Sequence, residues 1–167
     1  MQKILITLIC LVSFSFISKS TKAHCEVPCG IYNDSVRIKL IYEHITTIEK
    51  AMKQINEMNM PPVQIGKSSI KMNKKVNYNQ IVRWVNNKES HAEKIQEIVS
   101  QYFLHQRVKP VNQSDRHGYG HYVQKLELLH RLSVSAMKAK QTTDLVHIAN
   151  LRSTLAQFEK AYFTHTH

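Results

Sequence analysis

Cysteine is scarce in this sequence, and the few cysteines present are not spread along it. The 167 residues include only Cys10, Cys25 and Cys29, so the chain does not belong with the disulfide-dense small secreted proteins. No stretch alternates polar and apolar residues with a period of two, which argues against a β-sheet. No repeat of fixed period is present, which excludes a solenoid. The longest apolar run, residues 4–17, is shorter than the roughly 18–20 residues that a membrane-spanning helix needs.

The first 23 residues have the order of a secretory signal peptide. A positive start at Lys3 precedes the apolar run, and a polar, small-residue segment, 18–23, follows it. Ala23 suits the position before a cleavage site, so we expect His24 to become the amino terminus. An uncleaved anchor is the alternative, and the length of the run disfavours it. We therefore expect an exported protein, periplasmic or secreted, with no stable membrane anchor after cleavage.

The chain is basic, with a formal net charge of +11. The leader carries three lysines and no acid, so the mature chain keeps about +8. Such a balance is typical of proteins that bind nucleic acid, anionic membranes or small anions. An exported protein seldom meets nucleic acid, which favours a small anionic substrate, although a basic surface kept only for solubility stays open.

Four segments carry apolar residues three and four positions apart, the pattern of helices with one buried face. We expect helices at 35–58, 79–104 and 119–140, and a fourth capped by Thr142 or Thr143. The intervening segments 63–77 and 105–118 are expected to be loops. The expected core residues are Ile38, Ile41, Ile45, Ile48, Met52 and Ile55, then Ile81, Trp84, Val85, Lys88, Ala92, Ile95, Val99 and Tyr102, then Tyr122, Leu126, Leu129, Ser133 and Ala136, and finally Ile148, Leu151, Leu155, Phe158 and Tyr162.

The predicted fold class is all-α. Four helices of this length fit an antiparallel four-helix bundle, which we place at residues 35–163. An amino-terminal hook, 24–34, precedes it, and 164–167 form a frayed tail.

The hook concentrates metal donors. Cleavage before His24 provides a free amine and leaves an imidazole beside it. The backbone amide of Cys25, its thiolate and the thiolate of Cys29 complete two nitrogen and two sulfur donors. Such a planar set suits Ni(II) or Cu(II) better than zinc, which prefers a tetrahedron. A Cys25–Cys29 disulfide is the structural alternative, but so short a loop gives little entropic stabilisation.

These donors have a redox consequence. Thiolate and anionic amide ligands donate electron density and stabilise Ni(III), and an axial imidazole from His24 adds to the effect. A Ni(III)/Ni(II) couple of intermediate potential can both oxidise and reduce superoxide. Metal coordination and rapid turnover would then have to protect the thiolates from peroxide.

The segment 24–32 reads HCEVPCGIY and resembles the H-C-x-x-P-C-G-x-Y hook of nickel superoxide dismutases. The resemblance implies one nickel ion per subunit, held by the His24 amine and imidazole, the Cys25 amide and thiolate, and the Cys29 thiolate. It implies that Tyr32 lies over the open face of the metal and that Tyr102, in a Tyr-Phe pair, is the second active-site tyrosine. It also implies a homohexamer that converts superoxide to oxygen and hydrogen peroxide.

One feature departs from the familiar members of that family. They carry a glutamate on the first helix that, with an arginine from the next, orients the axial imidazole. That position falls at Lys39 or Leu40 here, so the pair is absent or rebuilt, with Glu43 or Glu49 as candidates. Two other functions stay open: an exported nickel- or copper-binding protein without catalysis, and a helical adhesion or assembly module with a disulfide.

Overall fold

The structure, a computed structural model, describes residues 33–59 and 77–164. The predicted hook residues 24–32 and the end of the predicted tail, 165–167, lie outside this part of the chain. Every regular element within the described residues is a helix. The order is α2 (Asp34–Asn59), α3 (Tyr78–Glu97), η1 (Ile98–Arg107), α4 (Arg116–Gln141) and α5 (Val146–Phe163).

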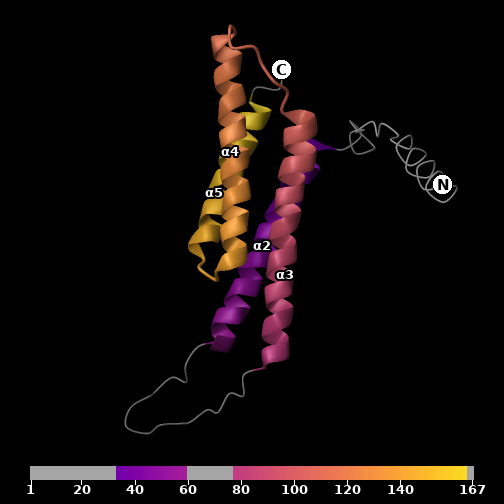
Figure 1. The fold of residues 1–167 in the computed structure, drawn as a ribbon, viewed down its shortest axis with the longest axis vertical. Coiled ribbons are helices and arrows are strands. Elements are labelled where there is room, and N and C mark those ends of the chain that lie inside the picture. The colour runs from indigo at the N-terminus through magenta and orange to yellow at the C-terminus, as the bar shows by residue number, and fades with distance from the viewer. Residues whose placement is uncertain (1–32, 60–76, 165–167) are drawn as a thin grey trace, which may run out of the picture.

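The helices form a four-helix bundle in which consecutive helices run in opposite directions (Figure 1). α2 packs along α3, α3 along α4, α4 along α5, and α5 closes the ring against α2. η1 continues α3 and packs on α4. The start of α2, the end of η1 and the end of α5 therefore meet at one end of the bundle (Figure 1). The predicted four-helix bundle is confirmed for the described residues.

The core follows the predicted stripes closely on α2 and α5. The six expected core residues of α2 and the five of α5 are all buried. Of the expected core residues on α3 and η1, those from Lys88 onward are buried. Ile81, Trp84 and Val85 are only half-buried. The reason is that α2 and α3 extend beyond α4 and α5 at that end (Figure 1). On α4 only Leu129 and Ala136 of the five expected core residues are buried, because the buried face is rotated toward Leu128, Leu132 and Ala139. The other three expected residues are half-buried: Tyr122, Leu126 and Ser133.

Lys88 lies inside the bundle with only 3% of its surface exposed. Its ammonium donates to the carbonyl oxygens of Ala139 (2.8 Å), Lys140 and Thr142 (3.1 Å). Carbonyl groups at the end of a helix have no partner within the helix, and a cation there also interacts favourably with the helix dipole. Lys88 therefore caps the carboxyl end of α4 from inside the core.

Two predicted helix boundaries differ from the structure by three residues. The second helix continues through Arg107 instead of ending at 104. α4 begins at Arg116, inside the predicted loop, because the Asp115 carboxylate accepts from the Gly118 amide (3.0 Å) and caps the helix. A Cβ at Gly118 would lie 2.3 Å from an Asp115 carboxylate oxygen, so this cap requires glycine.

Neither expected threonine caps the fourth helix. The carboxylate of Asp144 accepts from the Val146 amide (2.9 Å), and the Thr142 hydroxyl instead accepts from the Asp144 amide (3.3 Å). The acid therefore supplies the acceptor at the start of α5. Within the described residues, none of these helices combines the length and the apolar character that crossing a bilayer requires.

The position of Lys88 gives a stability prediction. Replacing Lys88 with Met should lower the free energy of unfolding by about 2 kcal/mol, because the buried carbonyls at the end of α4 lose their donor. Urea unfolding followed by circular dichroism measures the change. The matched control is Arg83→Met, at an exposed position of the same helix, which should change stability by less than about 0.5 kcal/mol. Equal stability of Lys88→Met and the parent protein would contradict the capping role.

Candidate functional site

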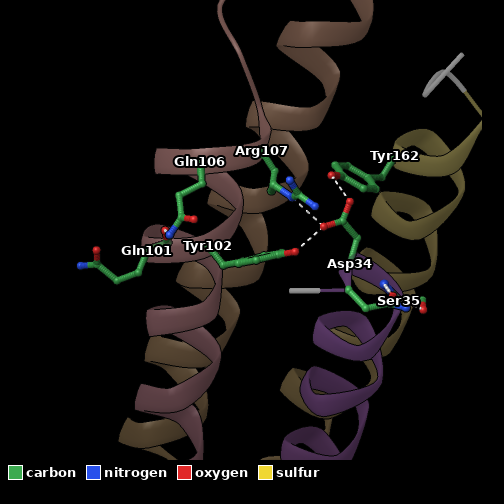
Figure 2. A network of polar contacts seen from close by, with 8 residues as sticks. Asp34, Ser35, Gln101, Tyr102, Gln106, Arg107 and Tyr162 are labelled. Carbon is green, nitrogen blue, oxygen red and sulfur yellow. Dashed lines mark hydrogen bonds and ion pairs between the residues drawn. The ribbon is translucent and has the colours of Figure 1, made fainter. Parts of the chain in front are cut away.

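A network of polar contacts centred on Asp34 joins three elements at one end of the bundle (Figure 2). Asp34 is the first residue of α2. Its Oδ1 accepts from the Tyr102 hydroxyl and from Arg107 Nε (2.6 Å), both on η1. Its Oδ2 accepts from the Tyr162 hydroxyl of α5 (2.8 Å). One carboxylate thus ties the start of α2 to η1 and α5.

The start of α2 is fixed by its own cap. Asn33 Oδ1 accepts from the Ser35 amide (2.9 Å), as expected for a helix N-cap. Asp34 then lies in the first helical turn, where the helix dipole favours a negative charge. Since Asn33 directly follows the predicted hook residue Tyr32 in the sequence, the network lies at the point where the hook joins the bundle.

The π-helical geometry of η1 brings Tyr102 and Arg107 to the same carboxylate. Residues five apart in an α-helix lie about 140° apart around the axis. A π-helix instead bonds residue i+5 to residue i, so residues five apart lie nearly above one another. The Val108 amide donates to the Phe103 carbonyl (2.8 Å) with this spacing. The Arg107 guanidinium accordingly lies 5.4 Å from the centre of the Tyr102 ring.

An aromatic cluster in the core contacts the rings of both tyrosines. Phe103, fully buried, makes edge-to-face contacts with Tyr102 (5.1 Å between ring centres), Phe158 (4.9 Å) and Tyr162 (5.4 Å). Such contacts stabilise the fold by more than the apolar area they bury would. The hydroxyl groups therefore reach Asp34 from rings that are fixed in the core.

The network shifts the ionisation of its members. Burial alone would raise the pKa of Asp34, but the hydrogen bonds from Tyr102, Arg107 and Tyr162 outweigh it and hold the pKa below the ordinary 3.8. Burial, followed by the hydrogen bond to Asp34, raises the pKa of Tyr102 and of Tyr162 above the ordinary 10.0. The hydrogen bond to Asp34 raises the pKa of Arg107. At neutral pH the site therefore contains a carboxylate, a guanidinium and two neutral phenols.

The predicted site residues divide into two groups. Tyr102 lies in the Asp34 network, with 6% of its surface exposed. His24, Cys25, Cys29 and Tyr32 lie outside the described residues, so their roles stay predictions.

Sequence reasoning missed three members of the network. From the sequence, Asp34 is expected only as the last residue of the hook, Tyr162 only as a core residue, and Arg107 as part of a loop. Their signal was weak, because the sequence pattern does not reveal a π-helix. The candidate glutamate Glu49 is engaged elsewhere, since it accepts from Lys53 (2.6 Å) and Arg152 (2.7 Å). The Glu43 side chain is exposed.

Some of the scattered histidines form pairs. His44 and His91, on α2 and α3, approach to 3.1 Å between their Nδ1 atoms, and burial and then His91 lower the pKa of His44 to about 4. His117 and His121, one turn apart on α4, approach to 3.2 Å between their Nε2 atoms. Within 33–59 and 77–164, no group of three or more His, Cys, Asp or Glu side chains could hold a metal ion.

The network predicts a pH-dependent contribution to stability. Asp34→Asn should lower the free energy of unfolding at pH 7 by about 2 kcal/mol, because a buried charge-assisted network loses its acceptor. The folded-state pKa of Asp34 lies below 3.8, so its contribution is present above about pH 4 and is lost as the pH falls through the lowered pKa. Thermal unfolding between pH 3 and pH 7 should show the gap between parent and variant closing at the acid end. A gap that stays constant to pH 3 would contradict this assignment.

Comparisons with known proteins identify the family. The sequence profile of nickel-containing superoxide dismutases matches residues 19–166, which include the hook and the whole bundle. No curated protein and no solved structure matches the chain. Enzymes of this family are oxidoreductases that contain nickel and act on superoxide. The match covers most of the chain, and the chain therefore belongs to the nickel-containing superoxide dismutase family.

Proposed function

We propose that the protein disproportionates superoxide to oxygen and hydrogen peroxide at a nickel ion held by its amino-terminal hook. The ligands would be the His24 amine and imidazole, the Cys25 amide and thiolate, and the Cys29 thiolate. When bound, nickel supplies the one-electron Ni(III)/Ni(II) couple on which both half-reactions depend. The observation that carries the proposal is the family match over a segment that contains HCEVPCGIY at 24–32.

The chemistry of this donor set fits the metal. Two nitrogen and two thiolate donors within a short peptide favour the planar coordination that Ni(II) accepts. Two thiolates and a deprotonated amide also lower the potential at which nickel is oxidised. The described bundle contains no cluster of three donors, so it offers no rival site within those residues.

The Asp34–Arg107 pair would position the hook. Familiar relatives orient their ligand with an acid on the first helix and an arginine from the next, and the expected position is Lys39 or Leu40 here. Asp34, on the first helix, instead pairs with Arg107 at the end of the second (2.6 Å). Asp34 lies two residues beyond Tyr32 in the sequence, and both members of the pair are half-buried. The Asp34–Arg107 pair would therefore take the place of the relatives' acid–arginine pair, at the point where the predicted hook joins the first helix.

Tyr102 would act on the substrate side of this anchor. Its hydroxyl points toward Asp34, at the root of the hook (Figure 2). Its raised pKa keeps the phenol protonated at neutral pH. Since its hydroxyl hydrogen is donated to Asp34, its oxygen would accept a hydrogen bond from water near the metal. With Tyr32 it would order substrate and water near the metal.

Processing and assembly complete the proposal. The signal peptide 1–23 would be removed during export to the periplasm or outside the cell, and the cut would create the amine of His24. Six subunits would then assemble, as the family resemblance implies. Export and activity would be linked, because an unprocessed chain lacks one ligand.

The amine ligand predicts a sharp dependence on the terminus. One extra Ala ahead of His24 should lower superoxide consumption at least about 100-fold, since both the amine and the chelate geometry are lost. Pulse radiolysis measures the rate and atomic absorption measures the nickel content. The helical content should equal that of the parent protein. Full activity in the extended protein would show that the amine is not a ligand.

Two matched hydroxyl deletions test Tyr102. Tyr102→Phe and Tyr162→Phe each remove one donor to Asp34. Tyr102→Phe should lower the rate constant about tenfold at saturating nickel, the effect of one lost hydrogen bond to the reacting groups. Tyr162→Phe should lose stability to a similar extent but retain more activity. Equal activity losses in the two variants would leave Tyr102 with a structural role only.

A further inference from the structure

A basic pocket adjoins the Asp34 network on the side of α4 and α5. It has a volume of about 440 Å³ and lies between the end of η1, the segment after it, α4 and the end of α5. Arg107 and Tyr162, which hold Asp34, are also part of its wall. A pocket of this volume can hold a small molecule or ion.

The pocket wall is positively charged. Lys109 and Lys125 contribute two ammonium groups, and Arg107 contributes a guanidinium. His117 and His121 add ring nitrogens, and Tyr122 and Thr164 add hydroxyl groups. Among the described residues, no Asp or Glu is part of the wall. The Asp34 carboxylate offsets only the charge of Arg107.

The two lysines lack counter-ions in the described part of the chain. Neither Lys109 nor Lys125 forms an ion pair there. Lys125 is half-buried, with its ammonium 5.6 Å from the centre of the Tyr162 ring. Burial lowers the pKa of Lys125, as expected for an ammonium drawn out of water without a neighbouring acid. An anion in the pocket would relieve that cost.

The helix end next to the pocket does not account for these features. The Gly118 amide in the first turn of α4 is already bound by Asp115. The positive character comes from side chains that converge from three elements. Ammonium, guanidinium and hydroxyl donors around one cavity match the oxygen atoms of a compact oxyanion.

We infer that this pocket, lined by Lys109, Lys125 and Arg107, binds a small multiply charged oxyanion of the phosphate or sulfate class. The residues that line the site all belong to the described bundle, and none of them is a predicted nickel ligand. Arg107 lines the pocket and also pairs with Asp34. A bound oxyanion would therefore contact a residue that itself contacts Asp34.

Calorimetric titration of the purified protein with inorganic phosphate tests the inference. At pH 7 and a constant ionic strength set by chloride, we expect one saturable site per chain with a Kd below about 1 mM. Sulfate should compete with phosphate, whereas extra chloride at equal ionic strength should not. No saturable phosphate binding, or equal competition by chloride, would overturn the inference.

Variants of the pocket provide the matched comparison. Lys109→Gln and Lys125→Gln should each raise the Kd for phosphate about fivefold or more, and Lys125→Arg should restore binding because it keeps the charge. Lys138→Gln, an exposed lysine at the other end of α4, removes the same charge and should change the Kd by less than about twofold. An equal effect of Lys138→Gln on the Kd would show that phosphate is held only by general electrostatic attraction to a basic protein, and would overturn the site.

The titration does not depend on superoxide turnover. It can be run on metal-free and nickel-loaded protein, so phosphate binding and catalysis succeed or fail separately. The side chain of Lys109 is exposed, so the fold of Lys109→Gln is expected to be intact. Circular dichroism of this variant checks that expectation. Binding unchanged in that variant and in Lys125→Gln would overturn the assignment of the pocket.

Discussion

The carboxylate of Asp34 is the interaction on which the functional end of this bundle depends. It accepts from Tyr102, Arg107 and Tyr162 and so joins the first helix to the end of the second and the end of the fourth. Without it, a half-buried arginine and two buried tyrosines would lose this acceptor, which is costly. Asp34 follows Tyr32 by two positions, so the contact that joins these helices lies next to the predicted hook in the sequence.

Helix count and core could be predicted from the sequence because they depend on spacing alone. The isoleucines of the first helix, together with Met52, recur every three or four residues, and every one of them from Ile38 to Ile55 is buried. Features that depend on neighbouring elements were harder. The half-buried start of α3 follows from the shorter reach of α4 and α5 (Figure 1), which the periodic pattern does not show. The pattern predicted that Lys88 is buried, but not that the carbonyl groups of another helix are its partners.

The candidate site divides along the same line. The hook could be read directly, because its donors lie within a few consecutive residues and the family match includes them. Tyr102 could be proposed from its Tyr-Phe pair, but its partner Asp34 lies 68 positions away in the sequence. Arg107 reaches that carboxylate through the π-helical geometry of η1. No residue pattern in the sequence predicted this π-helix. The hook could therefore be proposed from a local pattern and stays a prediction, while the partners of Tyr102 needed the fold.

The central claim is that cleavage creates a nickel ligand at the root of a bundle anchored by Asp34. Native mass spectrometry of the exported, purified protein tests it most directly, since one spectrum reports both the amino terminus and the bound metal. The account predicts a chain that begins at His24 and carries one nickel ion. A nickel-bound chain that begins at any other residue, or a chain that begins at His24 and remains metal-free after nickel loading, would contradict it.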